Sequence, residues 1–112
     1  MSDEMPGGRP PVVCLCGSTR FKQAFLDANR SETLAGRVVL SVGLFGHEEG
    51  IDMAGPVKAM LDRLHLAKID MADEVLVLNV GGHVGESTRR EVEYARGRGK
   101  RLRWLEPPVE PA

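Results

Sequence analysis

The segment 73–80 (DEVLVLNV) limits the fold more than any other part of the chain, because apolar side chains occupy consecutive positions in it. Successive residues of a strand point to opposite faces of the sheet, so this strand must be covered on both faces. Two other runs, 12–16 (VVCLC) and 37–42 (RVVLSV), have the same character, and 102–105 predicts a fourth strand. Strands of this kind are typical of a parallel sheet between two helical layers.

Three segments with helical features alternate with these strands. They are residues 20–35, before Gly36; residues 56–71, which begin with a proline; and residues 88–98, before Gly99. Proline favours the first turn of a helix, and glycine commonly follows the last. The alternation predicts an α/β fold, a small three-layer sandwich with a four-stranded parallel sheet of Rossmann-like or flavodoxin-like type and strand order 2-1-3-4. The second helix has an apolar stripe formed by Met60, Leu64, Ala67 and Met71.

Length and composition set limits on domains and partners. The 112 residues are 42% hydrophobic and 28% charged, as expected of one globular domain, here residues 12–105. Residues 1–11 and 106–112 each contain three prolines and predict flexible tails. The net charge of −1 argues against a nucleic-acid polymer or a membrane as partner. No apolar run approaches the roughly 20 residues that a membrane span needs.

The cysteines and the first residues bear on the cellular compartment. The first residues lack the basic and apolar regions of a signal peptide. Cys14 and Cys16 are expected on opposite faces of their strand, and therefore as free thiols. Reduced cysteines without an export signal favour a cytoplasmic protein.

Two unusual loops follow the first and third predicted strands, where strand order reverses and parallel α/β sheets bind their ligands. The first is residues 17–20 (GSTR). Gly17 lets backbone N–H groups approach an anion, the hydroxyls of Ser18 and Thr19 donate hydrogen bonds, and Arg20 can bind a phosphate bidentately. Helix capping by one of the hydroxyls is the alternative.

The second loop is residues 81–86 (GGHVGE). Gly81, Gly82 and Gly85 predict backbone lying close to a flat or charged ligand, with tight turning as the alternative. Glu86 and Ser87 then open a helix, whose free N–H groups form a second anion site. His83, between the glycines, is expected to be exposed rather than catalytic.

Glu91 has two interpretations. The pattern Thr88-Arg-Arg-Glu91 fits a capping box, in which the glutamate binds the N–H of the cap residue. Alternatively, Glu91 faces the cleft one turn into the helix, where a carboxylate can attack an anomeric carbon or act as a base. His65 and His47 are further possible ligand contacts; a satisfied helix histidine and a plain surface loop are the respective alternatives.

Cys14 and Arg20 have the Cys-x5-Arg spacing of low-molecular-weight tyrosine phosphatases and arsenate reductases. In those enzymes the cysteine opens the phosphate loop, whereas Cys14 is expected inside a strand. The chain also has no Asp-Pro dipeptide to supply the general acid of the phosphatases. A cysteine phosphatase is therefore the less favoured alternative.

A strand that ends in a Gly-Ser loop, together with Glu91-Val-Glu-Tyr-Ala95, resembles the nucleoside 2-deoxyribosyltransferase-like superfamily. This group includes the deoxynucleoside 5′-monophosphate N-glycosidases, and the resemblance covers about residues 12–105. It implies that Glu91 is the nucleophile that attacks C1′ of the sugar, and that residues 17–20 and 85–87 hold the 5′-phosphate. It further implies a homodimer or higher homo-oligomer, and chemistry without a metal or other cofactor.

Together the loops and the resemblance predict hydrolysis or transfer of an N-glycosidic bond in a nucleoside or nucleoside 5′-monophosphate. The alternative is a non-catalytic nucleotide-binding module, either a sensor or a regulatory subunit. Both functions need the two anion loops, but only the enzyme needs Glu91 as a nucleophile.

Overall fold

The computed structural model describes residues 8–45 and 55–108 of the chain. Its strands are β1 (Val12–Cys16), β2 (Val38–Leu40), β3 (Glu74–Val77) and β4 (Arg101–Trp104). They form one sheet in the order β2-β1-β3-β4, and every neighbouring pair is parallel. The predicted α/β class and strand order are confirmed, although β2 and β3 are shorter than the sequence predicts.

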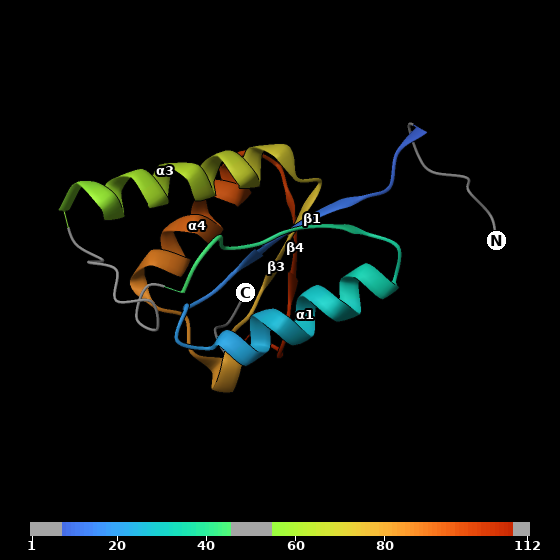
Figure 1. The fold of residues 1–112 in the computed structure, drawn as a ribbon, viewed down its shortest axis with the longest axis horizontal. Coiled ribbons are helices and arrows are strands. Elements are labelled where there is room, and N and C mark those ends of the chain that lie inside the picture. The colour runs from blue at the N-terminus through green and yellow to red at the C-terminus, as the bar shows by residue number, and fades with distance from the viewer. Residues whose placement is uncertain (1–7, 46–54, 109–112) are drawn as a thin grey trace.

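Helices cover both faces of this sheet (Figure 1). Helix α1 (Lys22–Leu34) lies on one face, and α3 (Gly55–Met71) and α4 (Glu86–Gly97) lie on the other. Helix α1 begins two residues later than predicted, because Phe21 N–H donates to the carbonyl of Ser18 (3.0 Å) and closes a turn first. Within the described residues, no helix is long and apolar enough to cross a membrane.

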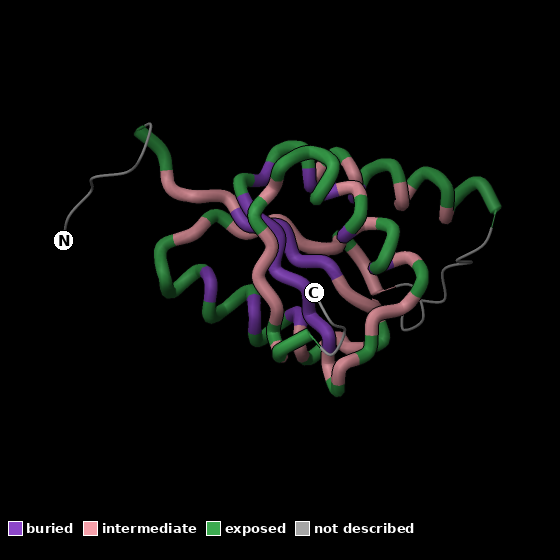
Figure 2. Tube along the Cα trace, turned by 180° about the vertical axis from the view of Figure 1, so that it is seen from behind, coloured by how far each residue is buried: buried purple, intermediate pink, exposed green. Residues whose placement is uncertain are grey.

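The core is divided between the two faces of the sheet, and its buried residues run along the central strands (Figure 2). Val13 and Leu15 pack with Phe25 of α1, whereas Cys14 and Cys16 pack on the face that α3 and α4 cover. The expectation that the two cysteines point to opposite faces is wrong, because side chains two residues apart on a strand share a face. They remain free thiols.

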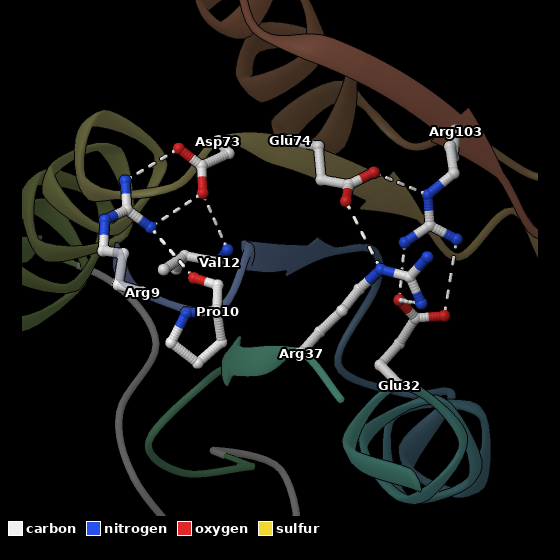
Figure 3. A network of polar contacts seen from close by, with 8 residues as sticks. All are labelled: Arg9, Pro10, Val12, Glu32, Arg37, Asp73, Glu74 and Arg103. Carbon is white, nitrogen blue, oxygen red and sulfur yellow. Dashed lines mark hydrogen bonds and ion pairs between the residues drawn. The ribbon is translucent and has the colours of Figure 1, made fainter. Parts of the chain in front are cut away.

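Two buried carboxylates on the α1 side of the sheet are neutralised by arginines (Figure 3). Arg103 Nε donates to Glu74 (2.7 Å), and its Nη2 donates to Glu32 (2.5 Å). Arg37 lies 3.4 Å from a carboxylate oxygen of each glutamate. This group of four side chains, the Glu32–Glu74–Arg37–Arg103 cluster, joins α1 to β3, β4 and the residue before β2.

A second ion pair lies at the amino ends of the strands (Figure 3). Both carboxylate oxygens of Asp73 accept hydrogen bonds from Arg9, at 2.8 and 2.9 Å, and one also accepts from the Val12 N–H. Hydrogen bonds from Arg9 and Val12 lower the pKa of Asp73 to about 2. Asp73 directly precedes β3, so it lies at the end of the sheet opposite the predicted site.

Candidate functional site

A cavity of about 550 Å³ opens at the carboxyl ends of β1 and β3. Four parts of the chain form its wall: the loop after β1, the segment after β2, one side of α3, and the start of α4 with the loop before it. This is the edge of the sheet at which the strand order predicts a ligand site. The volume lies within the range of about 300–1,000 Å³ that small-molecule sites occupy.

The loop after β1 lines the cavity with Gly17, Ser18 and Thr19. Neither hydroxyl caps α1, because the cap residue is Phe21 and no side chain bonds to the helix start. Ser18 Oγ instead accepts a long hydrogen bond from the Arg20 N–H (3.4 Å). The capping alternative is therefore wrong, and both residues line the cavity.

Arg20 is not part of the cavity wall. Its guanidinium lies over the ring of Phe21 (5.1 Å to the centroid), and its Nη2 is 3.2 Å from Nε2 of His83. His83 is exposed, as expected, but it does line the cavity. The predicted phosphate-binding arginine thus reaches only the rim, through the imidazole.

Gly81 and Gly82 do not line the cavity, and their conformation indicates tight turning. Both have positive φ, 63° and 82°, in the short 3-10 turn η2 (Val80–Gly82). The Gly81 N–H donates to the carboxylate of Glu106 (3.0 Å), and the backbone of Glu106 exchanges two hydrogen bonds with the Asn79 side chain. Glu106, which the sequence predicts to begin the flexible tail, therefore stabilises this turn through three hydrogen bonds.

The first turn of α4 lies on the cavity wall, and its backbone N–H groups have no cap from a side chain. Gly85 is the cap residue and has no side chain to bond them, and the Arg89 N–H makes the first helical bond, to the Gly85 carbonyl (2.9 Å). Glu86, Ser87 and Thr88 precede that bond and line the cavity. An uncapped helix start attracts anions, because its N–H groups and dipole both favour negative charge.

Glu91 does not belong to a capping box. The helix begins two residues before Thr88, so that threonine lies inside the first turn and cannot be the cap. The Glu91 side chain, 17% exposed, instead lines the cavity, with Oε1 3.8 Å from Nε2 of His65 on α3. Burial raises the pKa of Glu91, and the neighbouring charge of His65 opposes that rise.

His65 connects the cavity to the two thiols below it. The ring is buried and lines the cavity, and its Nε2 lies 3.3 Å from Cys16 Sγ and 3.8 Å from Cys14 Sγ. Burial lowers the pKa of His65, but contacts with Cys14 and Glu91 outweigh it, and the net shift is upward. The hydrogen bond between the thiols lowers the pKa of Cys14 to about 6 and raises that of Cys16, because the pair shares one negative charge.

Three charged residues of α3 also line the cavity, and the sequence reasoning missed them: Lys58, Asp62 and Lys68. Lys58 pairs with Asp62 (3.0 Å), and Lys68 Nζ donates to the Ser41 carbonyl (2.6 Å). Their spacing, with His65, by three or four residues places them on one side of a helix, which was the available signal. His47, a predicted contact, lies outside the described residues.

A comparison with protein-family models finds no match, and a comparison with curated proteins finds none either.

Proposed function

We propose that the chain hydrolyses or transfers the N-glycosidic bond of a nucleoside or nucleoside 5′-monophosphate, with Glu91 as the nucleophile. One observation carries the proposal: Glu91 lines the same cavity as Ser18, Thr19 and the uncapped start of α4. A nucleophile and an anion site in one hollow suit a substrate that has an anomeric carbon a few bonds from a phosphate.

The proposed reaction proceeds through a covalent intermediate. A Glu91 oxygen attacks C1′, the C1′–N bond breaks, and its electron pair leaves with the base, which takes a proton from solvent. Water then attacks C1′ of the glycosyl ester and regenerates the carboxylate, or a nitrogen of a second base does so in transfer. Two displacements at C1′ retain its configuration.

In this proposal the 5′-phosphate binds between the two anion loops. The Ser18 and Thr19 hydroxyls donate from one side, and the free N–H groups of residues 86–88 donate from the other. Arg20 interacts with the phosphate only indirectly, through His83 at the rim.

The test is release of free base from a panel of nucleosides and nucleoside monophosphates, followed by chromatography. Glu91→Gln should remain folded and lose at least about a thousandfold in turnover, since a carboxamide cannot act as the nucleophile. Glu93→Gln is the matched control on the same helix: Glu93 is exposed and absent from the cavity wall, so its turnover should not change. Wild-type protein that releases no base from any substrate would rule the enzyme out.

A nucleotide-binding module without catalysis is the second candidate, and it is favoured by the anion loops themselves. The hydroxyls and free N–H groups need no nucleophile to bind a phosphate. This function predicts calorimetric binding of monophosphates that is equal in wild type and Glu91→Gln, with no turnover in either. A cysteine phosphatase has less support, because Cys14 is fully buried in the middle of β1 and is not on the cavity wall.

A further inference from the structure

Two thiols and an imidazole converge beneath the cavity, on the face of the sheet that α3 and α4 cover. Cys14 Sγ, Cys16 Sγ and one ring nitrogen of His65 all lie within 4.8 Å of one another, and all three residues are buried. The two cysteines share a face of β1, and His65 reaches them from α3. Two sulfur atoms and one nitrogen atom that could coordinate a metal ion therefore lie close together.

The two thiols and the imidazole contact one another, and the imidazole nitrogen has more polar neighbours than it can bond at once. Nε2 of His65 faces three polar atoms at once: Cys16 Sγ at 3.3 Å, Cys14 Sγ at 3.8 Å and a Glu91 oxygen at 3.8 Å. A neutral imidazole nitrogen carries either one proton or one lone pair, so it can bond well to only one of them. A metal cation has several coordination positions, so it can bind the imidazole nitrogen and both sulfur atoms at once.

The spacing agrees with tetrahedral coordination. Bonds of about 2.3 Å to sulfur and about 2.0–2.1 Å to nitrogen place tetrahedral ligand atoms about 3.5 Å apart for a sulfur–nitrogen pair. The two sulfur–nitrogen distances here, 3.3 and 3.8 Å, lie on either side of that value. Every pair of the three donor atoms lies within 4.8 Å, so the three side chains are close enough to bind one ion.

We propose that Cys14, Cys16 and His65 form a binding site for a divalent cation of the zinc class. Two thiolates and an imidazole favour zinc or cobalt over magnesium or calcium, which prefer oxygen ligands. The ion enters from the cavity, since His65 lies on its wall, and a Glu91 oxygen lies 3.8 Å from Nε2 of the same imidazole. The family resemblance implies chemistry without a metal, so this site is independent of that expectation.

The experiment is a titration of metal-free protein with Co²⁺ in a thiol-free reductant. The full-length chain should take up one equivalent, with thiolate-to-cobalt charge-transfer absorption that Zn²⁺ then abolishes. Cys14→Ala, Cys16→Ala and His65→Gln should each lose this stoichiometric signal. His83→Ala should keep it, because His83 is an exposed histidine that does not contact the thiols.

Circular dichroism establishes which variants fold. Two folded variants among the three ligand substitutions are enough to test the site. Folded wild-type protein without the charge-transfer band overturns the proposal, as do folded ligand variants that bind cobalt as tightly as wild type does. Glu91→Gln separates this proposal from the proposed function: it should keep the thiolate band while base release is lost. The three ligands do not depend on the glycosidase reaction, so either proposal can fail without the other.

Discussion

Gly17 shows how the absence of one side chain shapes the candidate site. A Cβ built at this position would lie 3.0 Å from Cβ of Leu78 and 3.2 Å from its carbonyl oxygen. The loop after β1 therefore passes directly against the residue that follows β3. This close approach brings the hydroxyls of Ser18 and Thr19 to the same hollow as the start of α4.

Gly17→Ala should lower the free energy of unfolding by about 1–3 kcal/mol, because the added methyl group meets backbone that cannot easily move. Urea denaturation measures the change. Gly97→Ala is the matched control: nothing lies within 4 Å of its added Cβ, and it stands in the last turn of α4. The control should be neutral or slightly stabilising, by up to about 1 kcal/mol. Equal effects at the two positions would contradict this account of Gly17.

For individual residues, the sequence predicted which side chains line the cavity better than it predicted how these side chains contact one another. Ser87 lies on the wall as predicted, and Glu91 lies there too, which agrees with the second of its two interpretations. The approach of Glu91 to His65 depends on how α3 packs against α4, and no local pattern records that packing. The grouping of Cys14 with Cys16 was available from strand periodicity alone.

The position at which α4 begins decides between the two interpretations of Glu91, a capping box or a cavity residue. The hydroxyl pattern favours a start of α4 at Thr88, whereas the chain begins the helix at Glu86 after Gly85. A glycine cap leaves the first N–H groups without a partner, which costs helix stability but creates an anion site. The order of the elements was predictable, since it follows from apolar runs that alternate with helical segments. Their ends depend on single hydrogen bonds, which the sequence does not reveal.

The Glu32–Glu74–Arg37–Arg103 cluster is the main polar connection between α1 and the sheet. Arg103→Met should lower the free energy of unfolding by roughly 2 kcal/mol, because it leaves two buried carboxylates to share Arg37. The side chain of Arg103 is 28% exposed, so the loss should be smaller than for a fully buried pair.

Chemical denaturation of the double variant Arg103→Met/Glu32→Gln provides the control. Removing one of the two negative charges should restore part of the lost stability, since the repulsion between the carboxylates disappears. A double variant less stable than Arg103→Met would show that the arginine acts through packing rather than charge.

Helix α3 has an apolar stripe that is exposed on the surface of the molecule. Its members recur at helical spacing and are 40–65% exposed: Val57, Met60, Leu64 and Met71. The face that the helix buries instead carries His65 and Ile69. Exposed apolar patches commonly mark a contact with another protein or a ligand. The predicted homo-oligomer would use this stripe.

Light scattering coupled to size exclusion should therefore give a dimer or larger species for the wild-type chain. Met60→Glu should shift it toward monomer, because a charge buried in an apolar interface lacks a partner. Glu93→Gln, on another helix, should leave the mass unchanged. A wild-type chain that stays monomeric at every concentration tested would refute the predicted assembly.

The strand order also bears on how the chain folds during synthesis. Strand β1 emerges first, yet its partner β3 lies some sixty positions later, with Val13 opposite Glu74. In the folded chain α3 and α4 cover Cys14 and Cys16, so we expect the two thiols to be accessible to solvent until these helices have been synthesised. We therefore expect both thiols to be able to react with oxidants or metal ions during translation, before the second half of the chain buries them.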